Sequence, residues 1–413
     1  MKRRLLFAAT LALAALSQAP AIAQGPGAPP AATPAATPAA TPAPATEIVE
    51  KKVFETTGYV TRGGATIPTI RIGYQTAGTL NAAGDNAVIV THFFSGNSHA
   101  FGRYAEGQPA GYWDAIIGPG RAIDTNRYFV ISSDTLVNLN VRDGRTVTTG
   151  PVSVNPATGR PWALEFPVIA MRDFIEVQKR LLDSLGVRRL ALVAGASMGA
   201  LQAIEWAAAY PQMIDRVMPV IGSSEFDPWA IAWLDIWESP IRLDPNFNNG
   251  DYYAQGREPP TRGLAEALKI VTLQAQDRPA LARFGRRAAE GQDPLRRIGD
   301  RFEVERFLDE AAMARARVSD ANHFLYLVRA NQLFLHEYAS SEAALSRSQA
   351  RWFVVASPTD RVFMLDYNTE MVATLRRLGR PVDFAEVTGP LGHLNGVVGM
   401  APLADRIRAF LAH

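Results

Sequence analysis

The sequence predicts an α/β fold in which a mostly parallel central sheet is covered by helices. Two observations support this prediction: short, continuous apolar runs recur along the chain, and helix-forming stretches separate them. Runs this short are typical of strands that are buried on both faces. Their alternation with helices favours parallel pairing. The length of 413 residues allows one or two domains.

Each element has its own signal. Two exposed strands are expected near residues 52–60 and 68–75. Buried strands are expected at residues 87–91, 128–131, 190–193, 217–221, 352–355 and 382–387. Apolar residues between 174 and 185 repeat with helical spacing and stop at Gly186, which is typical of a helix end. A further helix is expected from Met198 to Tyr210, because Pro211 follows it.

No strand is expected between Ser224 and Arg351, where helix-forming residues dominate. We interpret about residues 225–350 as a helical cap over the carboxyl edge of the sheet. Trp229, Trp233 and Trp237 recur every fourth residue in it, so they share one helix face. That face either packs into the core or forms an aromatic wall above the substrate. In the second case, Trp229 and Trp233 are candidate substrate-binding residues.

The segment 1–23 has the pattern of a secretory signal peptide. Three basic residues precede an apolar run at 5–16, and Ala21-Ile22-Ala23 offers a cleavage site. The alternative is a membrane anchor, but the run is shorter than the roughly 20 residues needed to cross a bilayer. We therefore expect a periplasmic or secreted protein with no stable membrane insertion after cleavage. Residues 24–46 are rich in Pro, Ala and Thr, so they are expected to be an envelope spacer or a dispensable linker before a domain at 47–413.

Composition excludes several kinds of chemistry. The chain has no cysteine, so disulfides, thiolate metal sites and a cysteine nucleophile are ruled out. Its formal charge is +2, and removing the segment 1–23 with its three basic side chains makes it −1. No nucleic-acid partner is therefore indicated. No two histidines have metal-ligand spacing on one helix, so no metal and no cofactor are expected.

The strongest motif is Gly195-Ala196-Ser197-Met198-Gly199, which lies between a predicted strand and a predicted helix. A sharp strand-to-helix turn of this kind strains the central residue and exposes its hydroxyl, so the flanking positions must be small. The motif predicts Ser197 as a nucleophile. The alternative is a glycine-rich turn that only allows close packing.

A serine nucleophile needs a base, and the base needs an acid that orients it. His393 follows the last predicted strand and Asp360 follows the strand before it, which gives the order Ser, acid, His. Asp366 is the reserve acid, with a helix cap as its alternative role. The other histidines have structural roles as the better interpretation; His92 is expected to stabilise a turn. The backbone N–H groups of Met198 and Phe94 are expected to form the oxyanion hole.

These motifs resemble those of the homoserine O-acetyltransferases, a family of the α/β-hydrolase superfamily, over about residues 50–410. The resemblance is densest at residues 113–130 and 195–206 and around Asp360 and His393. It implies an α/β-hydrolase fold and a serine that accepts an acetyl group from acetyl-CoA and passes it to homoserine. It also implies that relatives often dimerise through the cap, so a homodimer is an open alternative.

The chain departs from this family at the acceptor site. Members usually have an aspartate directly after the catalytic histidine, where this chain has Leu394. An arginine and a tyrosine of the family's cap align with Leu268 and Ala275. A zwitterionic substrate needs paired opposite charges in a buried site, so homoserine is not expected to be the substrate.

Three functions follow from these observations. The first is a serine hydrolase acting on a small-molecule ester outside the cytoplasm, where acetyl-CoA is absent and water is the abundant acceptor. The second is an O-acyltransferase of the homoserine O-acetyltransferase type with another acceptor. The third is a binding protein on an inactive hydrolase scaffold, which the complete set Ser197, Asp360 and His393 makes the weakest of the three.

Overall fold

The computed structural model describes residues 46–412. The predicted signal peptide lies outside these residues, as does the Pro/Ala/Thr-rich segment apart from Thr46. Among the residues described, no helix has the length and apolarity that a membrane span requires.

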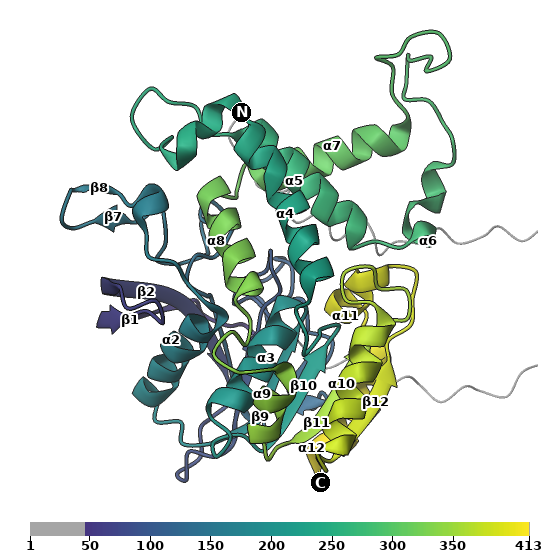
Figure 1. Cartoon of the computed structure of the whole chain (residues 1–413). Helices are drawn as coiled ribbons and strands as arrows, with labels where there is room; N and C mark the ends of the chain where they lie inside the picture. The colour runs from purple at the N-terminus through teal and green to yellow at the C-terminus, as the bar shows by residue number, and fades with distance from the viewer. Residues whose placement is uncertain (1–45, 413) are drawn as a thin grey trace, which may run out of the picture.

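An eight-stranded sheet forms the centre of the described fold (Figure 1). Its order is β1-β2-β6-β3-β9-β10-β11-β12. The strands are β1 (Lys52–Val60), β2 (Thr66–Ala77), β3 (Ala87–Thr91), β6 (Phe129–Ser133), β9 (Leu190–Ala196), β10 (Arg216–Val220), β11 (Arg351–Ala356) and β12 (Val382–Glu386). β2 pairs antiparallel with β1 and β6, and every pair from β6 to β12 is parallel. The predicted mostly parallel sheet is confirmed.

Side chains of the central strands alternate between two apolar layers. Ile89 and Val193 belong to one buried cluster, whereas Val88 and Leu192 belong to the other. The first layer is closed by α2 (Met171–Ser184), α3 (Met198–Ala209) and α10 (Leu365–Arg377). The second layer is closed by α12 (Ala404–Ala412) and by the segment at 100–123. Burial on both faces explains why the sequence shows continuous apolar runs instead of alternation.

Several short strands and helical turns lie outside the central sheet and its covering helices. Two small two-stranded pairs are β4 (Ile117–Gly118) with β5 (Ile123–Asp124) and β7 (Val154–Asn155) with β8 (Arg160–Pro161). Short helical turns are η1 (Ala163–Glu165), η4 (Gly392–Leu394), α11 (Asn395–Val398) and η5 (Ala401–Leu403).

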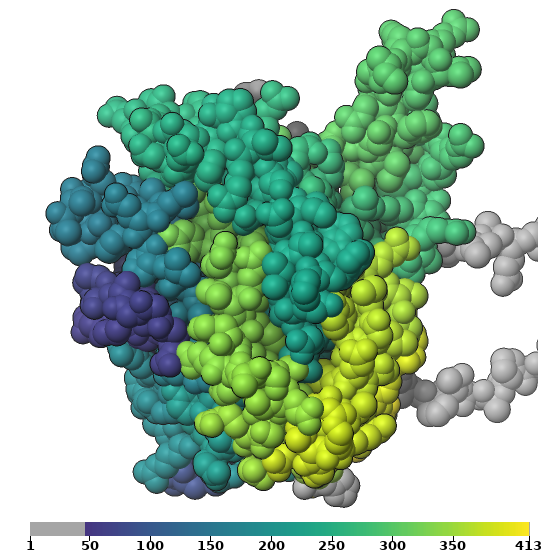
Figure 2. Space-filling model, viewed as in Figure 1, coloured from purple at the N-terminus to yellow at the C-terminus, as the bar shows by residue number. Residues whose placement is uncertain are grey.

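The interval between β10 and β11 contains only helical elements. They are α4 (Pro228–Leu243), η2 (Pro245–Gly250), α5 (Thr261–Gln274), α6 (Arg278–Leu281), η3 (Ala282–Phe284), α7 (Glu303–Ala316), α8 (Ala321–Gln332) and α9 (Ser341–Arg347). Helices α4, α5 and α7 lie above the sheet, and α9 returns to the body against α3 (Figure 1). The segment between α6 and α7, which we call the arm (residues 282–302), stands away from the body (Figure 2). Leu295 and Ile298 in the arm are exposed.

The three tryptophans of α4 have different surroundings. Trp237 is buried, its ring lies 5.5 Å from that of Phe94, and its Nε1–H donates to Gln274 of α5 at 2.7 Å. Trp233 is partly buried, and Trp229 at the start of the helix is 56% exposed. The tryptophan stripe therefore runs from the surface at Trp229 to the core at Trp237, because only Trp237 is enclosed by α5 and by the loop at the sheet edge.

Candidate active site

Ser197 occupies the sharp turn between β9 and α3. Its backbone has φ 59° and ψ −121°, a region that a residue with a side chain rarely adopts. The strand geometry holds this conformation, since the Ser197 N–H donates to the Val220 carbonyl of the neighbouring strand at 2.9 Å. Its hydroxyl makes no hydrogen bond among the residues described. The turn therefore presents a serine hydroxyl at the carboxyl edge of the sheet.

The glycines of the motif are required by close packing against the end of β3. A Cβ at Gly195 would lie 2.2 Å from the Thr91 hydroxyl, and one at Gly199 would lie 2.2 Å from the Thr91 carbonyl oxygen. The Thr91 hydroxyl in turn donates to the Gly199 carbonyl at 2.7 Å. Sequence reasoning did not single out Thr91, because a threonine at the end of a strand is ordinary until its neighbour is known.

Asp360 and His393 meet beside this edge, although they belong to loops that follow two different strands. His393 Nδ1 lies 2.7 Å from Asp360 Oδ2, and both side chains are almost fully buried. The other carboxylate oxygen, Oδ1, accepts from the backbone N–H groups of Val362 and Phe363 at 2.7 and 3.1 Å. The carboxylate is therefore fixed, and it holds the proton of His393 on Nδ1, which leaves Nε2 free to accept one.

The loop that carries His393 is held by buried side chains of two further residues. The Ser357 hydroxyl donates to the Gly392 carbonyl at 2.8 Å, and the Asn395 amide donates to Ser357 Oγ and to the Gly389 carbonyl, both at 3.1 Å. Gly392 itself has φ 64° and packs against the backbone of Asp277, so the cap helix α5 ends directly beside the histidine. Neither Ser357 nor Asn395 was predicted, since no local pattern marks a loop support.

Phe94 and Met198 lie on the two turns expected to supply oxyanion donors. Met198 is the first residue of α3, where backbone N–H groups have no partner within the helix. The N–H groups of both residues donate no hydrogen bond among the described residues. The Phe94 ring packs edge-on against Phe324 at 5.1 Å, as it does against Trp237. The arrangement can stabilise a negative oxygen if that oxygen lies between the two turns.

Two other histidines are deeply buried in structural contacts. His92 Nδ1 lies 2.8 Å from the Phe93 carbonyl and Nε2 lies 3.1 Å from the Asn138 amide. His323 Nδ1 lies 2.8 Å from the Asn138 carbonyl. Burial lowers the pKa of both imidazoles, which favours the neutral form. Their positions agree with the turn-stabilising and structural roles expected for them.

Asp366, the reserve acid, lies on α10, where its carboxylate accepts from the Tyr367 N–H at 2.9 Å.

The side chains expected to shape the acceptor site are apolar and partly or fully enclosed. Leu394 is partly buried against the second apolar layer, and Leu268 of α5 and Ala275, directly after α5, are buried. Within residues 46–412, no cluster of His, Asp and Glu could hold a metal ion.

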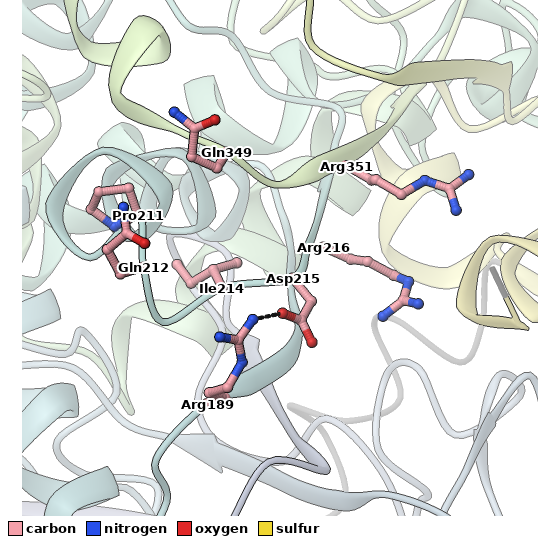
Figure 3. A pocket seen from close by; sticks show the side chains of 8 residues that line it. All are labelled: Arg189, Pro211, Gln212, Ile214, Asp215, Arg216, Gln349 and Arg351. Carbon is pink, nitrogen blue, oxygen red and sulfur yellow. Dashed lines mark hydrogen bonds and ion pairs between the residues drawn. The ribbon is translucent and has the colours of Figure 1, made fainter.

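A separate cavity of about 310 Å³ lies at the amino edge of the sheet. Figure 3 shows Arg189 paired with Asp215 there, with Arg216 and Arg351 on neighbouring strands. Arg189 precedes β9 and Ser197 follows it, so the length of the strand, roughly 20 Å, separates the cavity from the serine. This cavity therefore has no part in the chemistry at Ser197.

A family model described as the alpha/beta hydrolase fold matches residues 127–393, which include Ser197, Asp360 and His393. The chain belongs to this family. This α/β-hydrolase is 39% identical over 358 residues to the homoserine O-acetyltransferase of Symbiobacterium thermophilum, covering 85% of this chain and 91% of the relative. The expected likeness to homoserine O-acetyltransferases is thereby confirmed.

Solved structures of both functional classes match this α/β-hydrolase closely. Esterase E22 is 43% identical with a TM-score of 0.84, and the match covers 88% of this chain and all of the esterase. The homoserine O-acetyltransferase from Bacillus anthracis is 33% identical with a TM-score of 0.84, covering 89% and 98% of the two chains. The protein is therefore an enzyme of the homoserine O-acetyltransferase-like group, either an esterase or an acyltransferase.

Proposed function

We propose that this enzyme is a serine ester hydrolase that acts outside the cytoplasm. Ser197 Oγ attacks the ester carbonyl while His393 Nε2 takes its proton, and the oxyanion is held by the N–H groups of Phe94 and Met198. His393 then protonates the departing alcohol, which leaves an acyl group on Ser197. Water, deprotonated by His393, attacks this acyl-enzyme and releases the carboxylic acid. Asp360 keeps the imidazole oriented throughout.

The geometry that supports this mechanism is the buried contact between His393 and Asp360, combined with the strained turn at Ser197. The two features come from parts of the chain far apart in sequence, and both lie at the carboxyl edge of the sheet. An ion pair with a purely structural role would not explain why the Ser197 backbone is held at a positive φ, or why the N–H groups of Phe94 and Met198 donate no hydrogen bond among the described residues.

The observation that favours hydrolysis over transfer to homoserine is the apolar residue Leu394, directly after His393. An α-amino group bound there would have no carboxylate partner from this position, and an unpaired charge in a buried site costs several kcal/mol. Water needs no such recognition. The likeness to esterase E22, at 43% identity, supports the same choice.

A test of the hydrolysis uses the protein without the segment 1–23 and para-nitrophenyl esters of increasing chain length. Ser197→Ala should abolish turnover and the initial burst, whereas Ser184→Ala, at the end of α2, should change neither. Full activity of the Ser197→Ala enzyme on every accepted ester would exclude the proposed nucleophile.

An O-acyltransferase is the second candidate, because the curated relatives at 34–39% identity carry that activity in their names. The two candidates share the acyl-enzyme and differ only in what removes the acyl group. Homoserine with acetyl-CoA, or added alcohols with an ester donor, should leave the yield of free acid unchanged in a hydrolase. Diversion of the acyl group into a new ester would favour the acyltransferase.

The proposed substrate wall and location have direct tests. If Trp229 and Trp233 bind the substrate, Trp229→Ala should raise KM for long-chain esters more than for acetate and leave the melting temperature unchanged, since Trp229 is 56% exposed. An equal effect on all chain lengths would argue against the wall. Export predicts that the full chain, expressed in a bacterium, is recovered from the periplasm or medium with a mass that begins after Ala23.

A further inference from the structure

Arg315 in the cap carries a guanidinium that has no carboxylate partner among the described residues. Arg315, in the last turn of α7, donates through Nη1 to the Thr272 hydroxyl at 2.5 Å and to the Leu268 carbonyl at 3.5 Å, both on α5. Every carboxylate of α5 and α7 is paired with another cation; Lys269, for example, holds both Glu266 and Asp309. The charge of Arg315 is thus not neutralised by its surroundings.

The side of the guanidinium that carries Nε and Nη2 is free, and it is a side that can bind a carboxylate. Nε and Nη2 make no hydrogen bond among the described residues, and neither is sealed from solvent. These two nitrogens carry the parallel N–H groups that grip a carboxylate in a bidentate fork. The side chain is only partly accessible, and burial lowers the pKa of the group to about 10, so it stays protonated at neutral pH.

Arg315 is linked to His393 by one face of α5. Leu268 and Thr272 lie on the same face of α5, and Gln276 follows two residues beyond the last residue of the helix. Thr272 accepts from Arg315, and the backbone at Gln276 packs against Gly392, the neighbour of His393. Four residues separate Thr272 from Gln276, which corresponds to roughly 6 Å at the rise of an α-helix. The Gln276 Oε1 is buried and has no hydrogen-bond partner in the described part of the chain.

The chain just beyond this same end of α7 contacts the oxyanion turn. Ser319, just beyond the helix, donates to the Asn140 side chain at 3.1 Å, and the Asn140 amide donates to the Ser95 carbonyl at 2.9 Å. Ser95 follows Phe94. Arg315 therefore lies between a helix whose end is next to Gly392 and a junction that contacts the oxyanion turn, so it lies on the cap side of the proposed substrate region.

We propose that Arg315 binds a carboxylate of the substrate, so that the preferred esters carry an acid group a few bonds from the ester linkage. This inference rests on the proposed ester hydrolysis and narrows its substrate class. Such a substrate is an anion and not a zwitterion, which agrees with the apolar Leu394. A monoester of a dicarboxylic acid, or the ester of a hydroxy acid, has this chemistry.

The test compares esters of equal shape that differ only in charge. The acyl-side pair is mono-para-nitrophenyl glutarate and para-nitrophenyl 5-methylhexanoate, in which an isopropyl group replaces the carboxylate. The alcohol-side pair is 4-acetoxybutanoate and 4-methylpentyl acetate, followed by acid release. In the unmodified enzyme at least one anionic ester should have a kcat/KM about tenfold or more above its neutral partner, the gain expected of a hydrogen bond to a charged group.

Arg315→Met should remove this preference, mainly through KM, and leave kcat/KM for the neutral esters within about twofold. Arg315→Lys should restore part of it, because a point charge replaces the fork. Arg317→Met is the matched control, since Arg317 is exposed at the same helix end. An equal loss on charged and neutral esters would mean that Arg315 only joins α5 to α7, and absence of any anionic preference in the unmodified enzyme would also overturn the proposal.

A binding measurement separates this inference from the proposed function. Glutarate should bind to the Ser197→Ala enzyme, as measured by titration calorimetry, and Arg315→Met in that background should weaken binding about tenfold or more. If no ester is hydrolysed but glutarate binding depends on Arg315, the hydrolase proposal fails and the anion site stands. If esters are hydrolysed and glutarate binding is the same with and without Arg315, the anion site fails alone.

Discussion

Replacing Asp360 with asparagine tests the proposed catalytic contact with little disturbance of the fold. The asparagine oxygen can still accept from Val362 and Phe363, which now hold Oδ1 at 2.7 and 3.1 Å. The amide nitrogen then faces His393 Nδ1, in place of an oxygen 2.7 Å away. Because an amide N–H can only donate, the imidazole proton moves to Nε2, and Nε2 can no longer act as the proposed base for Ser197.

We expect Asp360→Asn to lower kcat by about 10⁴-fold, or about 5.5 kcal/mol of activation free energy. The urea midpoint should stay close to that of the unmodified enzyme. The assay is burst and steady-state hydrolysis of para-nitrophenyl butyrate at pH 7. Asp366→Asn is the control, since this exposed side chain only caps Tyr367. Retention of a tenth of the activity by Asp360→Asn, or a large loss in Asp366→Asn, would refute the reasoning.

Three further outcomes are expected. Gly199→Ala should cost about 1–3 kcal/mol of stability and most activity, because its Cβ would lie 2.2 Å from a β3 carbonyl oxygen, whereas Gly63→Ala should be neutral in both assays. Burial lowers the pKa of His323, so below about pH 6.5 the unfolded state binds a proton that the folded state does not. The free energy of unfolding should therefore fall by up to about 1.4 kcal/mol per pH unit because of this group. His323→Gln should reduce the pH dependence of that free energy, measured by urea unfolding from pH 7 to 5. If the enzyme is a dimer through its cap, Leu295→Asp with Ile298→Asp should give monomers in light scattering, and an unchanged mass would place any interface elsewhere.

Strand positions could be predicted from the sequence because both faces of the sheet are buried. The apolar run at 190–193 marks β9, and the motif that follows it marks the turn at Ser197. The ends of β2 were less well defined: the strand spans Thr66–Ala77, two residues beyond the predicted 68–75 at each end, because its residues alternate between exposed and buried positions and form no continuous apolar run.

Other features depend on contacts between distant segments and leave no local pattern. The arm at 282–302 is polar and irregular in sequence, so nothing indicated that it stands away from the body. Arg315 belongs to an amphipathic helix in which arginines usually face solvent, and only the position of α5 shows that this one lacks a carboxylate. The tryptophan stripe could be placed on one helix face, but not divided into a buried and an exposed end.

The position of the helical insertion also determines when the enzyme becomes competent during synthesis. The turn at Ser197 is complete once β10 has paired with β9, whereas Asp360 arrives only after β11 and His393 only after β12, behind all the helices between β10 and β11. A ribosome-bound chain, or one truncated before β12, would therefore carry a serine hydroxyl without its base. Such a chain lacks the base that activates Ser197, so esters would not acylate it before β12 has joined the sheet.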